Sequence, residues 1–177
     1  MKGRVFNALA KLPNRKECAY YLTDGGTVAA TDGRVAAFAG DYFPRLKKEQ
    51  TVCVAELPRL KGDRFYDLKL SPDGLKFVEH ITEQVAVEVS TVDVALPEQM
   101  YDSRHSRWPQ KRDADFFLNW ETLAWLGELA KAAKPTTVEV KLNGRDKPAR
   151  IAFRGNEFGV KEIVIYAMGL FLREKGE

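Results

Sequence analysis

Residues 26–36 read Gly-Thr-Val-Ala-Ala-Thr-Asp-Gly-Arg-Val-Ala, two short apolar runs that are separated by an Asp-Gly pair. This arrangement predicts a β-hairpin, because glycine adopts a positive φ without steric cost. We therefore expect strands over residues 27–31 and 34–39, joined by a turn at Asp32 and Gly33. A short carboxylate in a turn accepts hydrogen bonds from the backbone N–H groups that follow it. We interpret Asp32 as such a turn residue rather than as a catalytic acid.

Two amphipathic segments predict helices. Residues 3–12 place apolar side chains on one side of a short helix that Pro13 ends. Asn119 is a favourable N-cap for a longer helix that runs to about Ala133 and is closed by Pro135. The predicted core residues of the two helices are Val5, Phe6, Leu9 and Leu12 in the first and Leu123, Leu126, Ala130 and Ala133 in the second. Trp120 and Trp125, also in the second helix, are expected to pack in the core or in an interface.

The rest of the chain is rich in predicted strands. We expect them over residues 17–23, 51–56, 64–70, 75–80, 84–96, 115–118, 137–142, 149–154 and 161–170. Within residues 84–96 the alternation of valines changes phase after Val89, which predicts a bulge or a break. The expected fold class is α+β, with two units that each pack a helix on an antiparallel sheet. These half-units span about 1–40 and 115–170 of a single domain over 1–177, with a strand-rich insertion at 41–100 and a basic loop at 101–114.

Composition is typical of a globular protein that remains in the cytoplasm. The 177 residues are 45% hydrophobic and 30% charged, and no apolar run approaches the ~18 residues that span a membrane. The first residues lack the uninterrupted apolar core of a signal peptide. Cys18 and Cys53 belong to no CxxC pair, so we expect both thiols to be reduced and half-buried in strands.

Basic residues gather in two segments although the net charge is only +3. Residues 1–16 contain five cations and no acid, and residues 104–112 contain four cations around Trp108. Such clusters attract phosphate groups, but they are also common on solvated surfaces. The cations are Lys2, Arg4, Lys11, Arg15 and Lys16 in the first segment and Arg104, Arg107, Lys111 and Arg112 in the second.

No catalytic constellation is recognisable. The phosphate loop, the dinucleotide fingerprint and the common hydrolase motifs are absent from the sequence. His105 lies between Ser103 and Ser106, and Asp113 is close to Asp115, but we interpret these as ordinary loop residues and solvated charges. We expect a protein that is not an enzyme and that holds no metal or cofactor.

Several segments together resemble the bacterial sliding clamp, the β subunit of DNA polymerase III. The Ala-Thr-Asp-Gly hairpin resembles one of its hairpins. Residues 116–170 are similar to its last half-domain in order: Phe-Phe-Leu-Asn, a helix, two strands around Pro148, and a final strand that ends in Tyr-Ala-Met-Gly-Leu. Residues 101–109, which end in Trp108-Pro109, are similar to a segment of the family that precedes a proline. Clamp chains have three such domains, whereas this chain has room for one, as a divergent, phage-type member would.

The resemblance implies two kinds of binding residue. Clamp helices face the phosphates of duplex DNA, and a pocket between the hairpin and the final strand captures short peptides of replication proteins. The implied DNA-binding residues here are Arg4, Lys11, Arg15, Lys16, Arg104, Arg107 and Lys131. The implied peptide-binding residues are Thr31, Gly33, Arg34, Val35, Tyr166 and Met168. The alternative for Val35 and Met168 is that they are ordinary sheet-core residues.

Three functions are compatible with these features. The first is a homo-oligomeric, clamp-like processivity factor that binds duplex DNA without sequence preference and tethers replication proteins. The second keeps the fold without the ring, as an adaptor or inhibitor that binds polymerase or clamp-loader peptides. The third, a hydrolase or nuclease, is disfavoured by the missing motifs. Glu121 and Glu128 on the second helix also count against a simple basic channel lining.

Overall fold

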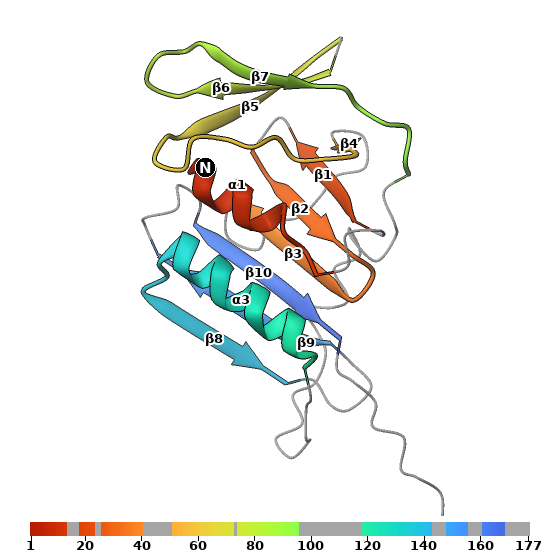
Figure 1. Cartoon of the computed structure of the whole chain (residues 1–177), viewed down its shortest axis with the longest axis vertical. Coiled ribbons are helices and arrows are strands. Elements are labelled where there is room, and N and C mark those ends of the chain that lie inside the picture. The colour runs from red at the N-terminus through yellow and green to blue at the C-terminus, as the bar shows by residue number, and fades with distance from the viewer. Residues whose placement is uncertain are drawn as a thin grey trace, which may run out of the picture.

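The computed structural model describes residues 1–13, 18–23, 26–40, 51–72, 74–95, 118–142, 148–155 and 161–168. Two helices and ten strands lie in these ranges (Figure 1). They are α1 (Gly3–Leu9), β1 (Ala19–Thr23), β2 (Val28–Thr31), β3 (Val35–Gly40), β4 (Thr51–Val54), β5 (Tyr66–Ser71), β6 (Gly74–Glu79), β7 (Val85–Val89), α3 (Trp120–Ala133), β8 (Thr137–Lys141), β9 (Ala149–Arg154) and β10 (Glu162–Ala167). The basic loop predicted at 101–114 and most of the strand predicted at 115–118 lie outside the described residues.

Seven strands form the main sheet, in the order β4-β1-β2-β3-β10-β9-β8. The two outer meanders, β1-β2-β3 and β8-β9-β10, are joined by antiparallel pairing of β3 with β10 over the full length of both strands. From β1 to β8 the order therefore reads the same from either end, with β1 corresponding to β8, β2 to β9 and β3 to β10. All strand pairs in the described residues are antiparallel, so the expected α+β class with antiparallel strands is confirmed.

Both helices pack on the same face of this sheet, α1 on the first meander and α3 on the second (Figure 1). They also contact each other, since the indole N–H of Trp125 donates to the backbone oxygen of Ala8 at 3.0 Å. The buried core lies between the helices and the sheet. Along β10, Ile163, Ile165 and Ala167 face this core, and the alternate residues face the opposite side.

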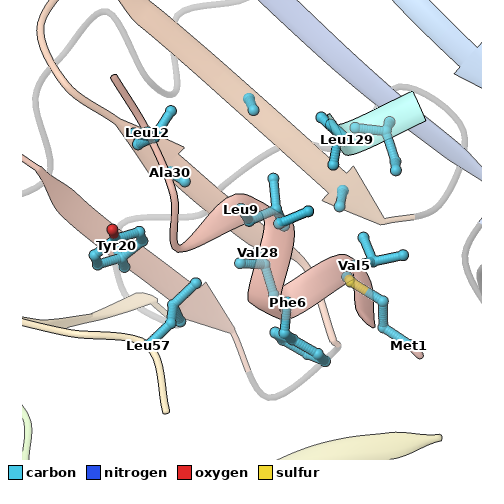
Figure 2. Close-up of a cluster of buried hydrophobic side chains, with 14 of the residues drawn as sticks. Met1, Val5, Phe6, Leu9, Leu12, Tyr20, Val28, Ala30, Leu57 and Leu129 are labelled. Carbon is cyan, nitrogen blue, oxygen red and sulfur yellow. The ribbon is translucent and has the colours of Figure 1, made fainter. Parts of the chain in front are cut away.

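The predicted core residues of α1 are correct, and its predicted end is not. Val5, Phe6, Leu9 and Leu12 are all 1% exposed or less, and Figure 2 shows them converging with strand residues beneath the helix. The helix nevertheless ends at Leu9, well before Pro13. A tighter turn follows, in which the N–H of Lys11 donates to the oxygen of Ala8, and this turn still directs Leu12 into the core.

The longer helix begins as predicted. Asn119 is its N-cap, and its side-chain oxygen accepts from the N–H of Glu121 at 2.8 Å. At the other end Lys134 adopts a left-handed conformation, with φ of 50°, just before Pro135. The predicted core face is partly wrong, because Leu123 is 55% exposed and Leu129, which was not predicted, is fully buried. Leu126, Ala133 and Trp125 are buried as expected. Turning the helix toward α1 buries Trp125 and leaves Leu123 on the far flank.

A second sheet, β5-β6-β7, lies beside the main sheet with β5 near β1, and it packs against α1 (Figure 1). The ring of Phe6 meets that of Phe77 in β6 edge to face, with 5.3 Å between centroids. The segment that precedes β5 also lies along α1, since the side chain of Asn7 both donates to and accepts from the backbone of Leu60. A Cβ at Gly3 would overlap the carbonyl oxygen of Lys61, so α1 and this segment are in close contact.

The break predicted near Val89 is present. Strand β7 ends at Val89, and Val92 forms an isolated antiparallel bridge with Cys53 in β4. A register shift also occurs earlier, opposite Phe77 and Val78. Both cysteines are free thiols, with Cys53 buried in β4 and Cys18 half-buried just before β1.

Candidate binding surface

The hairpin turn is organised by two short polar side chains. A carboxylate oxygen of Asp32 accepts from the N–H of Arg34 at 3.0 Å and from that of Val35 at 2.8 Å. The hydroxyl of Thr31 donates to the oxygen of Val35 at 2.8 Å and accepts from the N–H of Gly33. Gly33 has φ of 82°, which other residues adopt only with strain. Asp32 is fully buried and serves the turn, as expected from the sequence.

The end of β10 lies beside this turn. Tyr166 is opposite Ala36, Ala167 is opposite Val35, and the N–H of Met168 donates to the oxygen of Arg34 at 2.9 Å. Ala36 is also opposite Thr31, so Thr31 and Tyr166 share the face of the sheet that is turned away from the helices. The pairing of β3 with β10 thus brings the six implied peptide-binding residues to one place.

Five of these six residues present accessible atoms. Gly33 and Arg34 are exposed, Met168 is 42% exposed, and Thr31 and Tyr166 are half-buried. The Tyr166 ring packs edge to face on Phe38, which fixes one side of the surface. Val35 is different, because it is only 2% exposed and belongs to the core beneath the helices. We call the other five the junction surface: Thr31, Gly33, Arg34, Tyr166 and Met168.

The implied DNA-binding residues are not gathered in the same way. Arg4 is half-buried, and its backbone N–H donates to the oxygen of Gly62 in the segment that covers α1. Lys11 and Lys131 are exposed, and the Lys131 ammonium bonds Glu128 at 2.8 Å. This hydrogen bond, with the charges of Lys131 and Lys11, lowers the pKa of Glu128. The remaining four, Arg15, Lys16, Arg104 and Arg107, lie outside the described residues.

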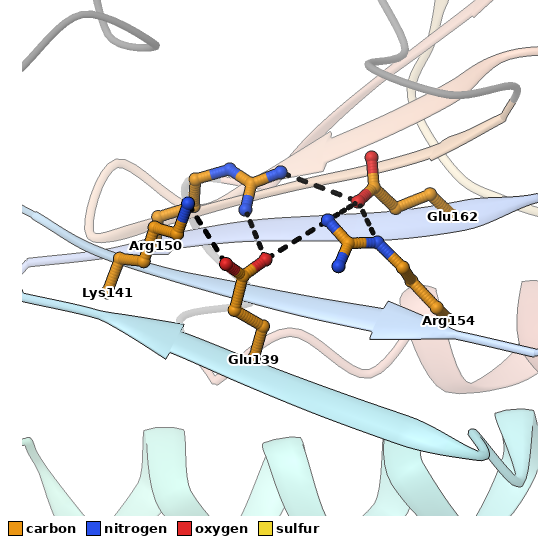
Figure 3. Close-up of polar contacts among 5 residues, drawn as sticks. All are labelled: Glu139, Lys141, Arg150, Arg154 and Glu162. Atoms are coloured by element: carbon orange, nitrogen blue, oxygen red, sulfur yellow. Dashed lines mark hydrogen bonds and ion pairs between the residues drawn. The ribbon is translucent and has the colours of Figure 1, made fainter.

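A charged cluster on the second meander was not foreseen from the sequence. Figure 3 shows it on the face of the sheet away from α3. Glu162 is fully buried and bonds Arg154 at 2.9 Å and Arg150 at 3.5 Å. Glu139 bonds Arg154 at 3.0 Å, Arg150 at 3.4 Å and Lys141 at 2.9 Å. The hydrogen bond from Lys141 lowers the pKa of Glu139, and the charges of Lys141, Arg154 and Arg150 act in the same direction.

The only sequence signal for this cluster is the spacing of its charged residues within each strand, where every second side chain points to the same face. Glu139 and Lys141 are two residues apart in β8, and Arg150 and Arg154 are four apart in β9, so each pair shares a face. The strand register then places Glu139 opposite Ala152, between the two arginines. That register is not readable from the sequence, because nothing local specifies which residues of two strands are opposite.

Groups suited to catalysis do not converge in the described part of the chain. His80 bonds Asp67 at 2.8 Å on the exposed surface of the second sheet. Across the described ranges, no three His, Cys, Asp or Glu side chains are placed to hold a metal ion. Ser103, His105, Ser106, Asp113 and Asp115 lie outside those ranges.

Neither of the described helices is long and apolar enough to cross a membrane. No protein-family model matches the chain, and no curated protein matches it either.

Proposed function

We propose that this chain is a non-catalytic, clamp-like adaptor that captures short peptides of a DNA polymerase or clamp loader on the junction surface. The observation that carries the proposal is the pairing of β10 with β3, which sets Met168 beside Arg34 and leaves both side chains exposed. Methionine is unbranched and adapts to different apolar partners. Gly33 allows a peptide backbone to approach the turn closely. Arg34 adds a cation that selects peptides with an acidic residue beside their apolar anchor.

The covering of α1 supports an adaptor over a ring that encircles DNA. In the clamp family the helices face the phosphates, and here the second sheet and the segment before it lie over one of the two helices. Of the two described helices, α3 has the longer uncovered side, and that side carries Glu121 and Glu128 as well as Lys131. The junction surface is on the other face of the sheet and is independent of this covering.

Fluorescence anisotropy tests the adaptor proposal. The probes are labelled peptides that tile the polymerase and clamp-loader subunits of the organism that carries the gene. We expect wild-type protein to bind at least one peptide. Met168→Glu should raise the dissociation constant of that peptide at least about tenfold, which is about 1.4 kcal/mol. Ile81→Glu is the matched control, because Ile81 is 74% exposed in the turn between β6 and β7, away from the junction surface.

Two outcomes contradict the proposal. The first is that no peptide of the set binds wild-type protein. The second is that the Met168→Glu and Ile81→Glu variants bind the peptide with the same affinity. If Met168→Glu unfolds the protein, Arg34→Glu replaces it, because the exposed Arg34 side chain can change without opening the core.

A sliding clamp on duplex DNA is the second candidate. It is favoured by one observation, the two helices on one face of a sheet whose strand order from β1 to β8 reads the same from both ends. Contacts with the DNA backbone would be sequence-independent and sensitive to salt. Replacing Lys11 and Arg15 together by Glu should weaken duplex binding and reduce the slope of log affinity against log salt by roughly 1.8, or about 0.9 for each phosphate contact. Duplex binding that does not respond to salt would eliminate this candidate.

A further inference from the structure

The two ends of the main sheet differ. At one end, β4 receives a hydrogen bond on its outer side, from the N–H of Val92 to the oxygen of Cys53 at 2.9 Å. At the other end is β8, and in the described ranges its only strand partner is β9. Figure 1 shows β8 at the margin of the sheet, running antiparallel to α3. A strand with an unpaired side is a template for another strand.

Apolar side chains accompany this open edge. Val138 and Val140 are opposite Phe153 and Ile151, which face the core under α3, so both valines lie on the helix side of the sheet. They are 52% and 58% exposed. Along α3, Trp120, Leu123, Ala124 and Gly127 follow the i, i+3, i+4, i+7 spacing of one helix face, and all are exposed.

We call the four large side chains the edge surface: Trp120, Leu123, Val138 and Val140. They are four of the ten large hydrophobic residues exposed in the described part of the chain. Single exposed apolar residues are common, but a group of them beside an open strand marks an interaction site.

We propose that β8 pairs with β8 of a second copy, antiparallel, about a two-fold axis at Val140. In this register Val140 is opposite Val140 of the partner subunit. Glu139 is opposite Lys141 of the partner subunit, and this charge pair occurs twice because of the symmetry. Opposite charges that face each other across strands are stabilising, whereas like charges are destabilising.

Neighbouring registers fit less well. An axis at Glu139 would place two carboxylates directly opposite each other. An axis at Val138 would place Glu139 opposite Thr137 of the partner subunit and leave Lys141 beyond the paired strands. Of these three, the axis at Val140 is the one that places Val140 opposite Val140 and Glu139 opposite Lys141 of the partner subunit, with Val138 opposite Leu142 just beyond β8.

The assembly stops at two copies. A two-fold interface uses the same surface on both subunits and leaves no second copy of that surface free. A ring built through the main sheet would need its other edge to receive β8, and the outer side of β4 is already bonded to Val92. This inference goes beyond the proposed adaptor function and does not depend on it, because the junction surface lies on the opposite face of the sheet.

Native mass spectrometry and light scattering of the full chain test the dimer. We expect wild-type protein to be dimeric and Val140→Arg to be monomeric, because the axis would bring the two new cations together. Val85→Arg is the matched control, since Val85 is a 53% exposed strand valine of the second sheet. A monomeric wild type, a larger ring, or a Val140→Arg variant that stays dimeric overturns the proposal.

Cysteine substitution tests the register and does not depend on the folding of Val140→Arg. Residues directly opposite in an antiparallel pair have Cα atoms about 4.5–5.5 Å apart, within the range of a disulfide. Val140→Cys should therefore form a crosslinked dimer on mild oxidation, and Val138→Cys should not, because its partner is Leu142. Mass spectrometry of the digested product identifies the linked cysteines and excludes links through Cys18. Equal crosslinking of both variants, or none, overturns this register.

Discussion

The two helices occupy corresponding places in the two halves of the sheet, and they are stabilised in different ways. Helix α1 has seven residues, no side-chain cap at Lys2, no acid in its first turn and no base in its last turn. Helix α3 has 14 residues, the Asn119 cap, Glu121 in its first turn and Lys131 in its last turn. Short helices without caps are unstable in water. The covering by the second sheet therefore stabilises α1, whereas α3 has local support and keeps one face free.

The outer face of the sheet shows a second contrast. Beneath the first meander it holds a small apolar cluster, which includes Tyr21, Phe38 and Cys53. On the second meander it holds the charged cluster around Glu139 and Glu162. The insertion and the apolar cluster make the first half the more covered one. The second half keeps the edge surface exposed, whereas the junction surface takes residues from both halves.

The largest effect is expected from Phe6→Ala, which removes the ring that joins α1 to the second sheet. Phe6 is fully buried, so the lost burial and the cavity should lower the free energy of unfolding by about 3–5 kcal/mol. Urea denaturation followed by circular dichroism measures this change. If the loss is below about 1 kcal/mol, the second sheet does not stabilise α1 and the contrast with α3 fails.

A smaller loss is expected from Trp125→Phe, which keeps an aromatic ring but removes the indole N–H that reaches Ala8. The oxygen of Ala8 keeps the N–H of Lys11 as a donor, so the lost indole hydrogen bond and the smaller buried ring should together cost about 1–2 kcal/mol. The same denaturation experiment measures it. An unchanged stability would mean that the two helices are held by apolar packing alone.

The next prediction concerns the cap of α3. Asn119→Ala removes the acceptor for the N–H of Glu121 and should lower the free energy of unfolding by about 1 kcal/mol. Asn119→Asp, which keeps a side-chain acceptor, is the control and should remain near wild type. Equal losses in both variants would show that local capping does not support α3.

The smallest expected effect is a pH dependence of stability that comes from Glu139 in the second meander. The pKa of Glu139 is lowered in the folded state, so its carboxylate stabilises the fold above its ordinary pKa. This contribution is lost as the pH falls through the lowered pKa, because protonation then removes the charge in the folded state too. At neutral pH the free energy of unfolding of wild type should exceed that of Glu139→Gln by less than about 1 kcal/mol. Urea denaturation at a series of pH values should show the difference narrowing in acid, and a constant difference would contradict the assignment.

Features determined by neighbouring residues were predictable from the sequence. Asp32 and Asn119 each bond backbone groups two or three residues away, so their roles follow from residue type and position. The buried side of α1 follows in the same way from the spacing of Val5, Phe6 and Leu9.

Features that depend on distant partners were not predictable. Trp125 is buried in accordance with its expected core or interface packing, but contact with α1 rotates α3 so that Leu123, also expected in the core, is exposed. The half-burial of Arg4 depends on a segment some 60 residues later, near Gly62. The implied peptide residues were located by the family resemblance, and only the strand register distinguishes buried Val35 from exposed Met168.

The pairing of β3 with β10 has a consequence for synthesis on the ribosome. About 120 residues separate the two strands in the sequence. One edge of β3 pairs with β2, but the other edge stays unpaired until β10 has been synthesised. During that interval its apolar edge is open to other nascent chains. Contacts that join distant parts of a chain also form slowly. Expression at low temperature or with chaperones should therefore improve the yield of native protein more than it does for a chain whose sheet forms from neighbouring strands alone.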